Sequence, residues 1–279
     1  MVATVGVNLR GGLGNRIFLA AAAHGLAAST GRVAVLAGAE ISSHSGRTYV
    51  DTVFGDFARR QGTNGTVEVV EPANRCLTYD GPLAQSVPPE FSVHLTGYFQ
   101  DERYLEGHGE EFVKRLRLPS VAVEHGTLFM HVRRGDYLRD YFHAVDLTGY
   151  FARAVELAKA TFGPQLVRIL AFSDDPEWCR VNVHFNDLVV DVSQDVDEEV
   201  ALARMAACEL GGICANSSFS WWGAYLGTKL GTKLGINRGA TPVKLITFPK
   251  TWFNHAPSSS PTAGVFVDDV AFAGSVRVM

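Results

Sequence analysis

Short apolar runs alternate with amphipathic segments through the second half of the chain, and this pattern restricts the fold more than any other feature of the sequence. Four runs with the length and composition of buried strands lie at 128–132, 166–172, 188–192 and 212–215. Two segments with apolar residues at helical spacing lie at 148–162 and 197–210. Strands and helices in this order form a mostly parallel sheet covered by helices, so an α/β unit is predicted.

The first half of the chain starts with the same kind of signal. Residues 2–9 form a nearly continuous apolar run, as in a strand buried on both faces, and glycines then interrupt it before a helix from about Asn15. Further strands are expected at 32–37, 67–70 and 92–99, followed by a helix at 101–116. The whole chain is therefore predicted to be α/β, with two Rossmann-like halves, residues 1–120 and 121–279, that face a cleft.

Composition and charge exclude several classes of partner. With 279 residues, of which 47% are hydrophobic, the chain can bury the cores of two such units. A net charge of −4 provides no general positive field for nucleic acid, and no apolar stretch approaches the roughly 20 residues of a membrane span. The four cysteines form neither a CxxC motif nor a cluster with histidines, which argues against zinc and disulfides. Together with the lack of a recognisable signal peptide, this predicts reduced thiols and a cytoplasmic location.

A glycine-rich turn follows the first expected strand. Gly11-Gly12-Leu13-Gly14-Asn15 lies between a strand and a helix, where missing Cβ atoms and free amides let the backbone approach a phosphate or a sugar. Ile17 occupies the position of the third glycine in a dinucleotide fingerprint, which argues against a nicotinamide-dependent dehydrogenase. Gly12, Gly14 and Asn15 are therefore candidate ligand-binding residues, and a purely structural turn is the alternative.

Basic residues gather at the end of the strand at 128–132. His131, Arg133 and Arg134 are costly to bury unless an anion meets them, and the planar fork of an arginine suits the oxygens of a diphosphate. This predicts a diphosphate site at the end of this strand. The alternative is that Asp136 simply pairs with Arg133 or Arg134.

Two acidic residues follow the strand at 166–172. Asp175 precedes Pro176 at an expected helix start and suits an N-cap, which leaves Asp174 as the freer carboxylate for contact with a base or a ribose. The two aspartates alternatively hold a metal. No further hard ligand stands at a recognisable spacing, so no metal site is predicted.

The strand at 212–215 leads into a helix whose first turn is rich in hydroxyl groups. The segment Asn216-Ser217-Ser218-Phe219 opens this helix, and helix N-terminal amides with serine hydroxyls make an anion site. The alternative assigns the serines to capping and the two tryptophans that follow to the core.

In this order the segments resemble the bacterial-type α-1,2-fucosyltransferases of glycosyltransferase family 11. The similarity also includes Gly97-Tyr98-Phe99-Gln100 and Trp178, and so runs through most of the chain. It implies a GT-B-like fold in which the first half shapes the acceptor site and the second half holds GDP-fucose. It further implies transfer with inversion to a glycan hydroxyl, O2 of a galactose, without a metal or another cofactor.

The resemblance assigns roles to individual residues. His131 and Arg133 would contact the diphosphate, and the helix opened by Ser217 and Ser218 would hold phosphate oxygens. Arg16 and Ile17 depart from the glutamine and the methionine or leucine usual in the first motif, which leaves open a different acceptor. The expected donor-binding residues are Gly12, Gly14, Asn15, His131, Arg133, Asp174, Asn216, Ser217, Ser218 and Phe219.

An inverting transfer needs charge stabilisation at the leaving diphosphate and a base for the acceptor hydroxyl. Arg133 is predicted to supply the first and Asp136 the second, although Asp136 is alternatively the structural partner of Arg134. The alternative bases are Asp140, Asp101 and Glu102. Two other functions stay open: a non-catalytic glycan- or nucleotide-binding protein, and a transferase for a different GDP-sugar.

Overall fold

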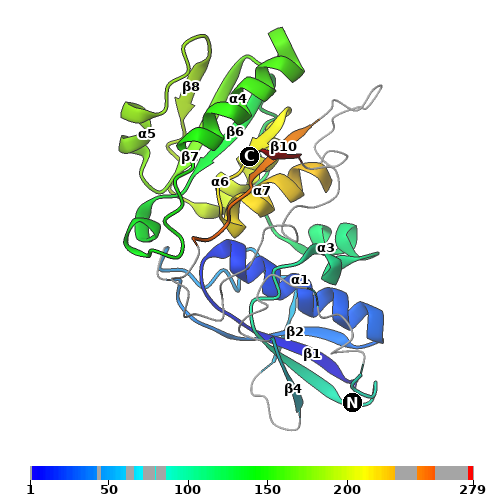
Figure 1. Cartoon of the computed structure of the whole chain (residues 1–279). Coiled ribbons are helices and arrows are strands. Elements are labelled where there is room, and N and C mark those ends of the chain that lie inside the picture. The colour runs from blue at the N-terminus through cyan, green and yellow to red at the C-terminus, as the bar shows by residue number, and fades with distance from the viewer. Residues whose placement is uncertain are drawn as a thin grey trace. The chain divides into compact units, whose positions relative to one another are not determined.

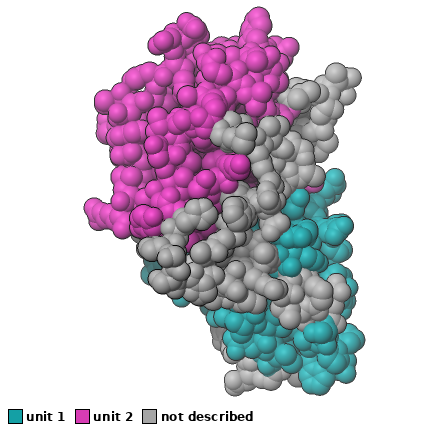
Figure 2. Space-filling model, in the orientation of Figure 1, with its two compact units in different colours: residues 1–118 teal, residues 119–279 magenta. Residues whose placement is uncertain are grey.

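The computed structural model describes residues 2–42, 45–60, 66–71, 79, 86–229, 244–254 and 276–278. The chain divides into two compact units, unit 1 of residues 1–118 and unit 2 of residues 119–279 (Figure 2). The division falls between Leu118 and Pro119, two residues before the position expected from the sequence. Each unit has a parallel sheet of its own.

Unit 1 is built around a five-stranded parallel sheet in the order β3-β2-β1-β5-β4. The strands are β1 (Thr4–Leu9), β2 (Val33–Ala39), β3 (Ala58–Arg60), β4 (Thr66–Val70) and β5 (Ser92–Thr96). Helix α1 (Leu13–Thr30) links β1 to β2 and packs against both strands (Figure 1). Every residue from Ile17 to Ala27 is buried, as expected for a helix that is apolar around its whole circumference.

The helix expected at 101–116 is wrong, because the segment forms two short helices instead. These are the 3₁₀ helix η1 (Glu102–Leu105) and α3 (Gly109–Arg115). Asp101 caps η1 by accepting a hydrogen bond from the Arg103 amide at 2.8 Å, and Glu106 leaves the helical conformation with a ψ of 124°. The strand expected at 92–99 likewise ends at Thr96. Capping and local backbone conformation, which apolar spacing does not register, set these boundaries.

Unit 2 contains a six-stranded parallel sheet in the order β11-β10-β9-β6-β7-β8. Its strands are β6 (Thr127–Val132), β7 (Arg168–Ser173), β8 (Val189–Val192), β9 (Gly211–Ile213), β10 (Leu245–Pro249) and β11 (Val276–Val278). From β6 the chain adds β7 and β8 on one side and then crosses to β9, β10 and β11 on the other. This is the doubly wound Rossmann order, which confirms the predicted α/β fold class.

Helices connect the strands of unit 2 as the alternating sequence pattern predicted. They are α4 (Thr148–Phe162), α5 (Pro176–Asn182), α6 (Glu198–Ala207) and α7 (Ser218–Lys229), with 3₁₀ helices η2 (Gly135–Arg139) and η3 (Gly163–Gln165). The predicted bounds of α4 are confirmed, and α6 begins one residue later and ends three residues earlier than expected. Apolar spacing did not predict β10 or β11.

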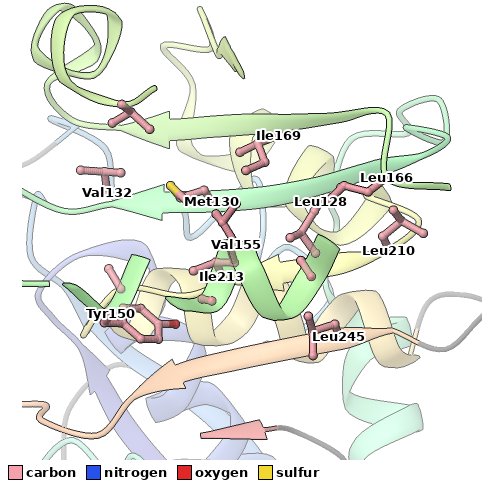
Figure 3. Packing of buried hydrophobic residues seen from close by; sticks show 14 of the residues in the cluster. Leu128, Met130, Val132, Tyr150, Val155, Leu166, Ile169, Leu210, Ile213 and Leu245 are labelled. Atoms are coloured by element: carbon pink, nitrogen blue, oxygen red, sulfur yellow. The ribbon is translucent and has the colours of Figure 1, made fainter. Parts of the chain in front are cut away.

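A buried cluster joins the sheet of unit 2 to α4. Successive residues of a strand point to opposite faces, so Met130 and Val132 share one face of β6 and His131 lies on the other. Figure 3 shows side chains of β6, β7, β9 and β10 converging on Tyr150 and Val155 of α4. This packing fixes β6 in the centre of the sheet and so fixes where the chain leaves its end.

Candidate functional site

The sheet of unit 2 has a topological switch point at β6. Strand β6 pairs with β7 on one side and with β9 on the other, and the chain reaches β9 only after the crossover from β8. Ligands of open α/β sheets bind at the carboxyl ends of the strands at such a point. The loop at 133–147 follows β6 and the segment 214–217 follows β9. Two of the motifs singled out in the sequence therefore lie at this edge of the sheet.

His131 is the penultimate residue of β6 and is only 5% exposed. Its ring centroid lies 5.6 Å from that of Phe219 in α7. Burial, with a smaller contribution from the charge of Arg133, lowers the pKa of His131 to about 3, so the imidazole is neutral near pH 7. Its Nδ1 atom has no hydrogen-bond partner among the described residues. A buried polar atom without a partner costs about 1–3 kcal/mol, which points to a ligand as the missing partner.

Arg133 is held between two carboxylates. Its Nη2 donates to Asp136 Oδ1, and its Nη1 lies 2.9 Å from Asp174 Oδ2. The guanidinium also lies over the Tyr137 ring, 5.0 Å from the centroid, and the side chain is only 16% exposed. The alternative that Asp136 pairs with an arginine is therefore confirmed, with Arg133 as the partner.

Arg134 makes a different set of contacts. Its Nε donates to Asp175 Oδ2 at 3.1 Å, and its guanidinium lies 3.8 Å over the centroid of the Trp178 ring. The interpretation of Asp136 as the partner of Arg134 is therefore wrong. Asp175 caps α5 as predicted, because it accepts the Trp178 amide at 3.1 Å, and this bond together with that from Arg134 lowers its pKa. These contacts tie the loop after β6 to the start of α5.

The expectation that Asp174 is the freer aspartate is wrong. Its Oδ1 accepts the backbone N–H of Arg134 at 2.9 Å, and its Oδ2 pairs with Arg133. Gly135 permits this approach with a φ of 23°, since a Cβ atom there would lie 2.3 Å from Asp174 Oδ2. The predicted contact of Asp174 with a base or a ribose thus competes with two contacts inside the protein.

The segment after β9 is fixed by the buried side chain of Asn216. Its Nδ2 donates to the carbonyl oxygens of His143 at 3.0 Å and Trp252 at 2.9 Å. The amide group therefore joins three segments of unit 2, a structural role that the sequence did not reveal. The expected contact of Asn216 with a donor stays a prediction.

Helix α7 begins at Ser218, as the sequence predicted. Ser217 is buried, and its Oγ accepts the Phe219 amide at 3.3 Å, which supports the capping alternative. Trp221 and Trp222 are almost completely buried, so core packing is confirmed for the tryptophans. Because α7 follows β9, the positive end of its dipole lies at the same edge of the sheet as the two arginines.

The carboxylates considered as bases already have contacts within the protein. Asp136 binds Arg133, Asp140 binds His143, and Asp101 caps η1. Glu102 belongs to η1 in unit 1. His143 was not among the residues predicted from the sequence. The sequence signal for it is its position three residues after Asp140, in a loop that follows a charged motif.

Gly12, Gly14 and Asn15 lie where the chain leaves β1, which is the switch point of the sheet of unit 1. Asn15 Oδ1 accepts a hydrogen bond from Gln100 Nε2 at 2.7 Å. The Gly-Gly-Leu-Gly-Asn and Gly-Tyr-Phe-Gln motifs of unit 1 therefore contact each other. The other candidate residues for donor binding belong to unit 2.

Two buried charged residues support these motifs of unit 1. Arg16, one of the departures noted in the sequence, donates through Nε to Gly11 O at 2.7 Å and through Nη1 to Thr48 O at 3.2 Å. Glu71 accepts the amides of residues 98–99 at 2.6 and 3.0 Å, and burial raises its pKa to about 7. Arg16 thus stabilises the glycine-rich turn from within the unit.

No group of three or more His, Cys, Asp or Glu side chains positioned to hold a metal occurs within the described ranges. Cys179, Cys208 and Cys214 are buried free thiols, in agreement with the prediction, and burial raises the pKa of each. Cys76 lies outside the described residues. Among the helices in those residues, none has the length and apolar character needed to cross a membrane.

Known proteins match this chain in the same region. Residues 89–247, which include all the candidate residues of unit 2, match the family model described as glycosyl transferase family 11. An alpha-1,2-colitosyltransferase of Escherichia coli is 31% identical over 155 residues, 48% of this chain and 51% of that protein. A galactoside 2-alpha-L-fucosyltransferase of Caenorhabditis elegans is 32% identical over 104 residues, 35% of this chain and 28% of that protein. The chain thus spans about half, or less, of the length of these relatives.

The fold also has a counterpart among solved structures. A crystal structure of the fucosyltransferase NodZ from Bradyrhizobium matches with a TM-score of 0.51, over 81% of this chain and 93% of that chain. Sequence identity is 13%, so the likeness concerns the fold alone. With the two parallel sheets, it confirms the GT-B-like fold class.

His131→Phe separates a structural role of this residue from ligand binding. Phenylalanine keeps a ring against Phe219 and removes the unpartnered nitrogen. At about pH 8 we therefore expect a free energy of unfolding within about 1 kcal/mol of the wild type, or above it, as measured by urea denaturation. A loss of more than about 3 kcal/mol would show that the nitrogen is bonded in the folded chain.

The same variant tests the pKa of His131. The pKa in the folded chain lies below the value of about 6.5 for an unfolded histidine, so protonation favours the unfolded chain and stability is lost as the pH falls from about 6.5 towards about 3. The wild type should therefore lose more stability than His131→Phe between about pH 7 and pH 4. Equal losses would contradict the neutral, buried imidazole.

Proposed function

The chain belongs to glycosyltransferase family 11, and from this premise we propose that it transfers L-fucose from GDP-fucose to O2 of a galactose in a glycan acceptor, with inversion at the fucose anomeric carbon. The family match covers every candidate residue of unit 2. The galactoside 2-alpha-L-fucosyltransferase among the relatives supports this donor sugar and this linkage.

One observation carries the proposal: a buried imidazole nitrogen without a hydrogen-bond partner among the described residues lies close to an arginine at the switch point of unit 2. His131 Nδ1 needs a hydrogen-bond partner, and Arg133 brings a positive charge two residues further along the chain. Helix α7 begins across the switch point, and the positive end of its dipole favours an anion there. A diphosphate bound at this edge would engage the guanidinium and the helix amides together, which supports a nucleotide sugar as donor.

Cleavage of the bond between fucose and GDP leaves negative charge on the β-phosphate. In the proposed mechanism, Arg133 and the N-terminal end of α7, at Ser217 and Ser218, stabilise that charge, so the reaction requires no metal or other cofactor. Asp136 and Asp174 hold the guanidinium in its orientation, and a diphosphate oxygen replaces one of them when the donor binds. Asp136 takes this orienting role instead of the role of base, because its carboxylate binds Arg133.

A further donor contact of the proposal lies in unit 2. Phe219 packs against His131 and holds the imidazole in place. The donor contacts predicted at Gly12, Gly14 and Asn15 of unit 1 stay predictions.

A second candidate function is transfer of a different sugar. The Escherichia coli relative with 31% identity is named as an alpha-1,2-colitosyltransferase, which favours this alternative over other glycosyltransferase activities. Both named relatives act at a 2-position, so the two candidate functions differ in the donor sugar and not in the linkage.

Donor choice distinguishes these functions. Purified protein is incubated with GDP-fucose, GDP-mannose, UDP-galactose or CMP-sialate, each with a galactose-terminated acceptor and excess EDTA, and released nucleotide is measured. We expect consumption of GDP-fucose alone, at a rate within about twofold of that without EDTA, because protein cations neutralise the leaving group. Preferred use of a UDP-sugar would contradict the proposal. Binding of GDP-fucose without turnover would support the non-catalytic alternative.

Arg133→Lys tests the residue on which the mechanism depends. Lysine keeps the positive charge but lacks the planar fork that engages two acceptors. Loss of one preorganised donor costs about 10²- to 10³-fold in kcat, so we expect a decrease of that size with little change in the thermal unfolding midpoint.

Arg180→Lys is the matched control for this substitution. Arg180 forms an ion pair with Glu177 within α5, so its replacement should leave kcat unchanged. If Arg133→Lys keeps near-native kcat, or simply unfolds, then Arg133 is a structural partner of its aspartates and the catalytic charge lies elsewhere.

A further inference from the structure

The acceptor hydroxyl must lose a proton during transfer, and the carboxylates next to Arg133 are already engaged. Asp136 and Asp174 both bind the guanidinium. A base that acts on the sugar must therefore come from another group at the same edge of the sheet. Asp140 and His143, on the loop that follows η2, form such a group.

Asp140 and His143 are joined as a histidine–carboxylate pair. His143 Nδ1 lies 2.5 Å from Asp140 Oδ2, and Asp140 Oδ1 accepts the Phe142 amide at 3.0 Å. The hydrogen bond with His143, aided by that from Phe142, lowers the pKa of Asp140, so the carboxylate is ionised. An ionised carboxylate at Nδ1 keeps the proton on that nitrogen and leaves Nε2 as a proton acceptor.

The second nitrogen of His143 is open to a substrate. The side chain is 31% exposed, and Nε2 makes no hydrogen bond with any of the described residues. The imidazole therefore has one nitrogen oriented by a carboxylate and the other available, the arrangement of a general base.

His143 contacts both sides of the switch point. Its carbonyl oxygen accepts Asn216 Nδ2 at 3.0 Å, from the segment after β9. Its ring centroid lies 4.6 Å from that of Tyr137, and the Arg133 guanidinium lies 5.0 Å from the centroid of the same tyrosine. The imidazole and the arginine proposed to bind the leaving group thus lie against the same tyrosine ring, which places a base near the attached sugar.

The loop that carries His143 is held in place by hydrogen bonds. The side-chain Nδ2 of Asn254 donates to Tyr141 O at 2.7 Å and to Ala144 O at 2.8 Å. Its backbone N–H donates to Phe142 O at 2.9 Å. A catalytic group must be kept within about 0.5 Å of its productive position. A loop fixed at three carbonyl groups meets this requirement better than a free one.

Given the transferase function proposed above, we propose that His143 is the general base of the reaction and that Asp140 is its positioning residue. Nε2 takes the proton of the acceptor hydroxyl while the acceptor oxygen forms a bond to the anomeric carbon of the donor sugar. The bond from that carbon to the β-phosphate oxygen breaks, and its electron pair leaves with GDP. Asp140 stabilises the resulting imidazolium, which then releases its proton to water.

His143→Gln is the principal test, with His125→Gln as the matched control. His125 pairs with Glu209 at 3.3 Å in the same unit but precedes β6, at the opposite end of the strand. Loss of a general base costs about 10²- to 10⁴-fold, so kcat of His143→Gln should fall by that factor while the Kd for GDP stays within about twofold. The pH profile of kcat should also change in this variant, because glutamine cannot take up a proton. His125→Gln should match the wild type in all three measurements.

Two further variants separate proton transfer from a structural role. His143→Ala should regain kcat on addition of imidazole, which would not repair a loop that had lost its shape. Asp140→Asn keeps an acceptor for Nδ1 but removes the charge, and should lower kcat while GDP still binds. If His143→Gln fails to fold, Asp140→Asn decides: lower kcat with unchanged GDP binding supports the proposal, and wild-type kcat overturns it.

The possible failures are distinguishable. Wild-type turnover is first established with whichever sugar nucleotide the protein consumes. No turnover with any of them would overturn the proposed function and this role with it. Normal wild-type turnover combined with an unaffected His143→Gln would overturn the role of His143 alone.

Discussion

Unit 2 depends on the parallel pairing of β6 with a strand on each side. All six residues of β6 are buried, so packing on both faces and hydrogen bonds to β7 and β9 hold the strand together. The order in which the chain adds strands reverses at β6, and all the strands are parallel. The loop after β6 and the first turn of α7 therefore lie at the same edge of the sheet. The charged residues of both motifs are thus placed by the core, and each needs only short local contacts to reach its final orientation.

The contacts at this edge orient charges more than they stabilise the fold. Asp136 is 57% exposed, and ion pairs with an exposed partner contribute about 0–1 kcal/mol. His131 lowers stability, because its buried Nδ1 lacks a partner among the described residues. These side chains add little to the stability of the fold. They do fix the orientation of a guanidinium, a neutral imidazole and a histidine–carboxylate pair, as a binding and catalytic site requires.

Periodicity predicted the parts of the structure that burial controls. The helix at 148–162 and the strand at 128–132 follow from apolar spacing, and the charged motifs were placed correctly at strand ends. Periodicity could not predict which charged residues pair within the site. The backbone turn at Gly135 allows Asp174 to reach Arg133, and apolar spacing carries no information about this turn. The hydrogen bonds of Asn216 and the pairing of Asp140 with His143 depend on the conformation of loops. A local sequence pattern does not predict that conformation.

The proposed function requires the donor diphosphate to bind at the switch point of unit 2, and a crystal structure of the protein with GDP would show where it binds. We expect a diphosphate oxygen within about 3 Å of the Arg133 guanidinium and of an amide at the start of α7. We also expect that Asp136 or Asp174 no longer binds the arginine. A diphosphate bound elsewhere, with Arg133 still paired to both aspartates, would contradict it.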